Sequence, residues 1–140
     1  MKIRDFAEVD LKIPMLPDME LAATKTAEAM AEYLSCDKDK TDEIKLALIE
    51  ATLNAFEHSN SKERNVEIKF VADENILKIK IHDSGTGFDS ENVETPKIEN
   101  KIKSDYKRGW GMQLMEQLMD SVEVQNDESG CTIIMTKRRV

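Results

Sequence analysis

The stretch Leu46-Ala-Leu-Ile-Glu50-Ala-Thr-Leu-Asn54-Ala-Phe-Glu-His58 decides the fold of this chain, because it has the 3.6-residue repeat of an amphipathic helix. The apolar face of this helix comprises Ile44, Ala47, Leu48, Ala51 and Ala55. Its polar stripe comprises Glu43, Glu50, Asn54 and Glu57, which lie within about 60° of one another. The pattern predicts a helix from about Thr41 to His58.

The polar stripe brings two chemically useful groups together. Glu50 and Asn54 are four residues apart, so a carboxylate and an amide oxygen lie side by side on one helix face. Such a pair suits a hard cation and a proton acceptor. A solvated stripe on an ordinary surface helix is the alternative, and this helix alone does not separate the two.

On the N-terminal side of this helix, the sequence predicts one strand and one further helix. Residues 7–15 alternate apolar and polar side chains and end at Pro14 and Pro17, as expected for a strand. Residues 18–35 are rich in alanine, methionine, leucine and glutamate, and Asp18 is placed to cap a helix.

On the C-terminal side, a predicted hairpin comes first. Residues 66–70 and 77–82 alternate apolar and polar side chains, and Asp73-Glu74-Asn75 is the turn between these two strands. The polar residues 89–108 are then expected to form a long loop, and loops of this length inside a domain are usually functional.

A third helix and a second hairpin complete the chain. The helix is expected to follow Gly109 and Gly111 and to run to about Asp120. Strands near 122–126 and 131–137 follow, with a turn at residues 127–130. The order β-α-α-β-β-loop-α-β-β predicts an α+β fold, a two-layer α/β sandwich with helices on one face of a mostly antiparallel sheet.

Composition limits the class of protein. A chain of 140 residues with no linker is expected to form a single domain over residues 1–140. A net charge of −8 argues against binding to nucleic acid, because phosphate contacts need clustered lysine and arginine. The basic run 137–139 is expected to be a solvated tail. The N-terminus does not have the pattern expected of a signal peptide, and no apolar run approaches the roughly 18 residues of a membrane span. Cys36 and Cys131 are expected to be buried free thiols of a reducing cytoplasm, with a disulfide as the alternative.

The segment Leu77-Lys-Ile-Lys-Ile-His-Asp83-Ser-Gly85-Thr-Gly87-Phe88 is a second candidate for chemistry. Strand alternation puts Asp83 on the same face as the apolar residues before it, where a carboxylate needs a hydrogen-bond donor. An adenine exocyclic amine is one donor and a turn amide is another. The glycines let a ligand approach the main chain closely. An ordinary Asp/Gly turn explains this segment equally well in isolation.

The segment Lys107-Arg108-Gly109-Trp110-Gly111-Met112 is a third candidate. A glycine pair that opens a helix exposes backbone N–H groups at the positive end of the helix dipole, where phosphate binds. Arg108 adds a charge that can reach a phosphate. A plain helix start, with Trp110 as a core anchor, is the alternative.

Together, these segments resemble the GHKL (Bergerat-fold) superfamily of DNA gyrase B subunits, heat-shock chaperones and histidine kinases. Glu50-xxx-Asn54 matches the N box, residues 83–88 match the G1 box and residues 109–112 match the G2 box. The resemblance covers essentially the whole chain and implies the histidine-kinase-like ATPase fold.

Within the superfamily, the chain looks like the anti-sigma-factor serine kinases of bacterial partner-switching systems. Histidine kinases usually carry asparagine four residues before the N-box asparagine, where this chain has Glu50. The pattern Glu-xxx-Asn-Ala-xx-His at residues 50–58, in a domain of this size, is similar to the anti-sigma kinases. Trp110 departs from the usual small aliphatic residue between the G2 glycines, and the intact G1 box departs from many anti-sigma kinases.

The resemblance implies a role for each matching residue. Asn54 would coordinate Mg²⁺ that bridges the phosphates of ATP, and Glu50 would be the general base toward a serine hydroxyl, or toward water in a slow ATPase. Asp83 would accept the adenine amine, with Thr132 near the same edge, and residues 89–108 would be the ATP lid. The implied nucleotide-binding set comprises Asn54, Asp83, Gly85, Gly87, Arg108, Gly109, Gly111 and Thr132. His58 occupies a family position, and it is either a nucleotide contact or a packed or capping residue.

The resemblance also implies partners and a function. The chain would be an ATP-dependent serine/threonine kinase and anti-sigma-like regulator in the bacterial cytoplasm that phosphorylates a STAS-domain antagonist. A sigma factor is a further candidate partner, and a homodimer through the first strand and adjacent helix faces is expected. The alternatives are a non-catalytic, nucleotide-gated binding module and a slow GHKL ATPase.

Overall fold

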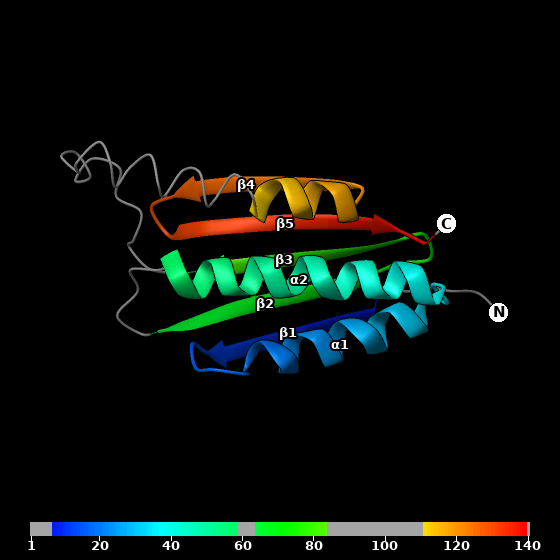
Figure 1. The fold of residues 1–140 in the computed structure, drawn as a ribbon, viewed down its shortest axis with the longest axis horizontal. Helices are drawn as coiled ribbons and strands as arrows, with labels where there is room; N and C mark the ends of the chain where they lie inside the picture. The colour runs from blue at the N-terminus through cyan, green and yellow to red at the C-terminus, as the bar shows by residue number, and fades with distance from the viewer. Residues whose placement is uncertain (1–6, 59–63, 84–110, 140) are drawn as a thin grey trace.

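Five strands form one antiparallel sheet in the spatial order β1-β2-β3-β5-β4 (Figure 1). The computed structural model describes residues 7–58, 64–83 and 111–139. The strands are β1 (Ala7–Pro14), β2 (Asn65–Ala72), β3 (Ile76–Asp83), β4 (Ser121–Asp127) and β5 (Gly130–Arg138). The helices are α1 (Glu20–Tyr33), α2 (Lys38–His58) and a helix at residues 111–118.

All of these helices lie on one face of the sheet (Figure 1). The predicted α+β, two-layer architecture with a mostly antiparallel sheet is therefore confirmed. Within the described residues, no helix combines the length and the apolar character that a membrane crossing requires.

The core lies between the sheet and the helices, and strand register builds it in rows. One row crosses the whole sheet through Val9, Phe70, Ile79, Met135 and Val122. Three of these five side chains, those on the inner strands, have no exposed surface. Because side chains alternate along each strand, the other face carries mostly charged and polar residues. Among the described residues, no helix lies over that face (Figure 1).

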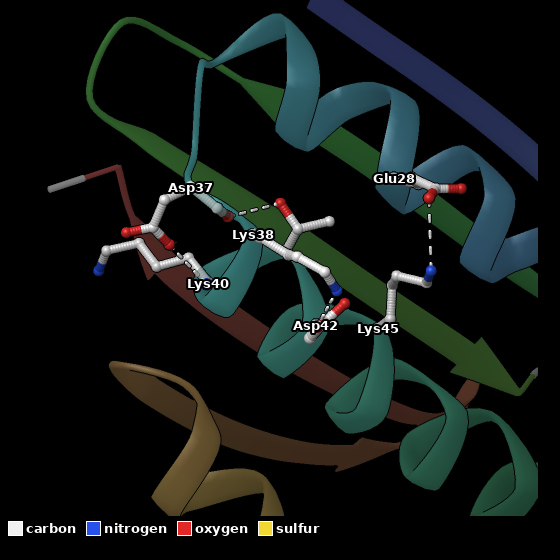
Figure 2. A network of polar contacts seen from close by, with 7 residues as sticks. Glu28, Asp37, Lys38, Lys40, Asp42 and Lys45 are labelled. Carbon is white, nitrogen blue, oxygen red and sulfur yellow. Dashed lines mark hydrogen bonds and ion pairs between the residues drawn. The ribbon is translucent and has the colours of Figure 1, made fainter.

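α2 begins one turn earlier than the sequence pattern indicated. The Asp37 carboxylate accepts a hydrogen bond from the Lys40 backbone N–H (2.8 Å), which makes Asp37 the cap of the helix (Figure 2). Lys38 and Asp42 form an i,i+4 ion pair (2.9 Å) in the first turn. Lys45 then reaches Glu28 of α1 (3.4 Å), which links the two long helices. The apolar repeat missed this turn because its residues are all polar.

The start of α1 also differs from the expectation. Asp18 was expected to cap this helix, but Met19 occupies the cap position and no side chain caps it. Asp18 instead has a φ of 73°, in the left-handed region, and its carbonyl oxygen accepts the Leu21 N–H (3.1 Å). The tight turn that follows Pro14 and Pro17 therefore takes Asp18 out of the capping conformation.

Both predicted hairpin turns are confirmed. The Asp73 carboxylate accepts the N–H groups of Asn75 (2.7 Å) and Ile76 (3.0 Å), so it closes the β2–β3 turn. In the β4–β5 turn, Asp127 accepts both the N–H and the hydroxyl of Ser129. These hydrogen bonds hold the pKa of the Asp127 carboxyl below its ordinary value.

The basic run at the end of the chain is only partly the solvated tail that was expected. Lys137 lies within β5, on the core side, and is buried. Its ammonium group donates a hydrogen bond to Glu43 of α2 (2.9 Å) and one to the Leu118 carbonyl oxygen. Arg138 and Arg139 are exposed, as expected. The register of β5 puts Lys137 inward because it follows Ile133 and Met135 at two-residue steps.

Candidate functional site

The polar stripe of α2 faces the helix at residues 111–118. Small side chains on the sheet side of α2, Ala47 and Ala51, have no exposed surface and let this helix lie close to the strands. Glu50 and Asn54 are half-buried on the adjacent side of the helix. They are therefore part of a packed region rather than a solvated surface stripe.

Gly111 brings the two helices into contact. A β-carbon added at this glycine would lie 3.0 Å from Glu50 Oε2 and 3.6 Å from Asn54 Nδ2. The predicted general base, the predicted magnesium ligand and one predicted phosphate-binding glycine thus meet at one point. Glycine leaves room there for the backbone of a helix N-terminus to approach the two side chains.

An apolar cavity adjoins this point. It has a volume of about 90 Å³ and is bounded by α2, β3, β4, β5 and the helix at 111–118. Its polar lining includes Asn54 at one side and Asp83, at the end of β3, at another. Its other lining residues are Ala55, Ile81, Met112, Val124, Cys131 and Ile133. A flat apolar group that carries an amine could enter between these walls and donate a hydrogen bond to Asp83.

A second hollow begins one turn back along α2. It has a volume of about 350 Å³ and is lined by Glu50, Gly111, Gln113, Leu114 and Gln117. The apolar cavity alone is smaller than the roughly 300–1,000 Å³ of small-molecule sites. Asn54 lines the apolar cavity and Glu50 lines the second hollow. The base of a nucleotide therefore suits the apolar cavity, and its phosphates suit the second hollow near Gly111.

Thr132 is not part of this site, contrary to the sequence-based expectation. It faces the uncovered side of the sheet, where its hydroxyl is 2.8 Å from Nδ1 of His82. That side holds a different hollow of about 560 Å³, lined in part by both residues. Thr132 faces away because it is adjacent to Ile133 in β5, and successive side chains of a strand point to opposite faces. Ile133 points to the core.

Cys131 occupies the place that was expected for Thr132, and the sequence reasoning missed it. It pairs with Asp83 across β3 and β5 and lines the apolar cavity. The alternation of Cys131, Ile133 and Met135 would have identified it. Cys131 and Cys36 are free thiols, as predicted, but both are half-buried rather than buried. Burial is the largest cause of a raised pKa of the Cys36 thiol, so it stays protonated near neutral pH.

Several predicted site residues lie outside the described residues. These are Gly85, Gly87, Arg108, Gly109 and the expected lid at 89–108. The side chain of His58 is also outside the described part. The site that the structure brings together therefore consists of Glu50, Asn54, Asp83, Gly111 and the apolar cavity between them.

Comparison with known proteins shows the family of this chain. The family model described as the histidine kinase-like ATPase domain matches residues 13–137. This chain belongs to the histidine kinase-like ATPase family. The GHKL resemblance of the three sequence segments is thereby confirmed, and the matched range contains every residue of the candidate site.

Relatives of this ATPase domain show to which group within the family it belongs. The chain is 31% identical to serine-protein kinase RsbW of Bacillus subtilis, over 92% of this chain and 84% of that protein. It is also 31% identical to RsbW of Bacillus licheniformis, over 92% of this chain and 84% of that one. The chain is therefore a member of the anti-sigma-factor serine kinase group within the histidine kinase-like ATPases.

A solved structure confirms the fold of this ATPase domain. The RsbU and RsbW domains of a Mycobacterium tuberculosis protein match it with a TM-score of 0.69 and 14% identity. The match covers 94% of this chain and 32% of that chain.

Replacing Gly111 with alanine tests the contact between the two helices. We expect phosphoryl transfer to fall about ten-fold, the effect of about 1.4 kcal/mol, because the new methyl group displaces the Glu50 carboxylate. The melting temperature should stay the same or rise slightly, since alanine favours helix more than glycine does. Transfer and thermal unfolding measured on one preparation check both expectations. Glu116→Ala, an exposed position on the same helix, is the control, and a parallel fall in both quantities would indicate general damage instead.

Proposed function

We propose that this chain is an ATP-dependent serine kinase that regulates a bacterial partner-switching system by phosphorylating a STAS-domain antagonist. The observation that carries the proposal is the meeting of Glu50 and Asn54 with Gly111, beside an apolar cavity that contains Asp83. These groups suit the metal, phosphate and base ends of an ATP molecule. The RsbW relatives are named serine-protein kinases, which supports transfer to serine.

Each residue has one task in the proposed reaction. Asp83 accepts the exocyclic amine of adenine, and Cys131, its partner across β3 and β5, also lines the cavity. Asn54 offers its amide oxygen to Mg²⁺, which prefers one or two protein oxygens plus substrate phosphates. The metal, when bound, neutralises charge on the phosphates. The helix at 111–118 directs its first N–H groups toward the phosphate tail.

Glu50 handles the proton of the reaction. The serine oxygen forms a new bond to the γ-phosphorus while the bond between that phosphorus and the β–γ bridging oxygen breaks, so ADP leaves. Glu50 accepts the hydroxyl proton, which converts the serine into a better nucleophile as the new bond forms. Because the transfer is mostly positioning and charge neutralisation, this small set of groups is sufficient.

The proposal extends to assembly and location. β1 is an edge strand of the sheet. Leu16, which follows β1, and Leu21 of α1 are 55% and 51% exposed. Both observations support a homodimer through β1 and α1. Sedimentation at micromolar concentration checks the dimer, and a monomer there would contradict it. We also propose that the kinase acts in the cytoplasm, where a STAS-domain protein and a sigma factor would be its partners.

Asn54→Ala tests whether this asparagine holds the metal. We expect the Kd for ATP in the presence of Mg²⁺ to rise at least about ten-fold, the effect of about 1.4 kcal/mol. The variant should also lose most of the dependence of ATP binding on Mg²⁺, because the remaining contacts do not involve the metal. Calorimetric titrations with Mg²⁺ and with EDTA measure both.

The control is Asn75→Ala, an exposed position in the β2–β3 turn whose contact there is made by its backbone N–H. Wild-type protein that gives no heat with Mg-ATP would refute the proposed function. Wild-type binding that Asn54→Ala leaves unchanged would remove Asn54 from the metal site.

A further inference from the structure

Lys137 connects three elements that build the nucleotide site. It extends from β5, and its side chain is only 8% exposed. Its ammonium donates to Glu43 of α2 and to the carbonyl oxygen of Leu118, at the end of the helix at 111–118. A lysine is seldom buried unless its charge is paired. This one has an anionic partner on one helix and a backbone partner on the other.

The C-terminal end of the helix at 111–118 is therefore anchored to the sheet. The last carbonyl groups of a helix have no partner within the helix, and a cation there also interacts favourably with the helix dipole. Beyond the lysine contact, the Asp120 N–H donates to the Thr136 carbonyl oxygen (2.9 Å). The Asp120 carboxylate in turn accepts the Arg138 N–H (2.7 Å). Among these contacts, only that of Lys137 also reaches α2.

The same two helices meet again at the site. Gly111 begins the short helix and lies against Glu50. At a rise of about 1.5 Å per residue, it is about 10.5 Å from Leu118 at the other end. Glu43, the partner of Lys137, is two turns before Glu50 on the same stripe of α2. The helices are thus joined at one end by Lys137 and face each other across the proposed phosphate region at the other.

We propose that Lys137 is a positioning residue for phosphate binding, which fixes the N-terminus of the helix at 111–118 relative to Glu50 and Asn54. The proposal rests on the proposed function. It assigns no contact between Lys137 and the nucleotide. It also separates two parts of nucleotide affinity. The apolar cavity with Asp83 is lined mainly by β3, β4, β5 and the end of α2, and among its lining residues only Met112 comes from the helix at 111–118.

Lys137→Met tests the proposal, because methionine fills a similar volume and cannot donate either hydrogen bond. We expect the Kd for Mg-ATP to rise about ten-fold, as for the loss of one hydrogen bond to a charged group. The Kd for adenosine, which has no phosphate, should change less than about two-fold. Calorimetry with both ligands gives the ratio of the two constants. A merely structural effect would weaken both ligands alike and leave this ratio unchanged.

Two further variants complete the test. Glu43→Gln keeps an acceptor but removes its charge, and we expect a smaller change of the same kind, about three-fold for ATP. Lys69→Met removes a half-buried lysine on the uncovered face, whose ion pair with Glu8 is 4.0 Å long, and should change neither Kd. If Lys137→Met does not fold, the ratio of the two Kd values in Glu43→Gln alone tests the positioning role.

The outcomes separate the inference from the function on which it rests. Wild-type protein that binds neither ligand refutes the proposed function and the inference with it. Wild-type protein that binds both, with a ratio unaltered in Lys137→Met and Glu43→Gln, refutes the positioning role and leaves the proposed function intact. A selective loss of ATP affinity supports the inference.

Discussion

Phosphoryl transfer by the Glu50→Gln variant is expected to be slower than wild type by about two to four orders of magnitude, the usual contribution of a general base. Glutamine has the shape of glutamate, so the contact with Gly111 is preserved, but it cannot accept the serine proton. The Kd for Mg-ATP should therefore stay within about two-fold of wild type. Single-turnover transfer to a STAS-domain protein and calorimetry with ATP measure the two quantities.

Glu57→Gln is the matched control, because Glu57 is two turns further along the same stripe of α2 and is exposed. Its transfer rate should equal that of wild type. If Glu50→Gln transfers phosphate at the wild-type rate, Glu50 is not the base. If wild-type protein binds ATP and a partner but transfers nothing, the chain is a nucleotide-gated binding module instead.

Phe70→Ala is expected to have the largest effect on stability, about 3–5 kcal/mol lost from the free energy of unfolding. Phe70 is fully buried on β2, an inner strand, between Val9 of β1 and Ile79 of β3. Alanine would leave a cavity there that the paired strands cannot collapse to fill. Since domains of this kind have a total stability of about 5–15 kcal/mol, most of the margin would be lost.

Urea unfolding checks this expectation through a lower midpoint with an unchanged slope. Val71→Ala is the control, because the adjacent side chain points to the uncovered face and is half-buried. Its effect should be less than about 1 kcal/mol. A similar loss for both variants would mean that the uncovered face contributes as much to stability as the core.

The fold was predictable from the sequence because its two repeats are regular. Two-residue alternation identified the inner strands, and the 3.6-residue repeat placed Glu50 and Asn54 on one stripe of α2. The boundaries were less predictable. The first turn of α2 is polar and depends on the Asp37 cap, while Asp18, which has the composition of a cap, is held in another conformation by the turn before it.

The candidate site was predictable in part. The approach of Gly111 to Glu50 follows from how two helices pack on one sheet, which the sequence pattern does not contain. The error at Thr132 has a simpler origin. Strand alternation from Ile133 assigns the cavity wall to Cys131, and a motif match that is wrong by one residue in a strand selects the opposite face. The same alternation would have placed Lys137 inside.

The pairing of β1 with β2 has a consequence for how the protein is made. Residue 9 lies opposite residue 70, and both long helices are encoded between them. When the chain leaves the ribosome, the first strand emerges without a partner and must wait while α1 and α2 are synthesised. The β2–β3 and β4–β5 hairpins, by contrast, can close as soon as they emerge. Until β2 has been synthesised, the unpaired edge of the first strand can bind chaperones or associate with other chains.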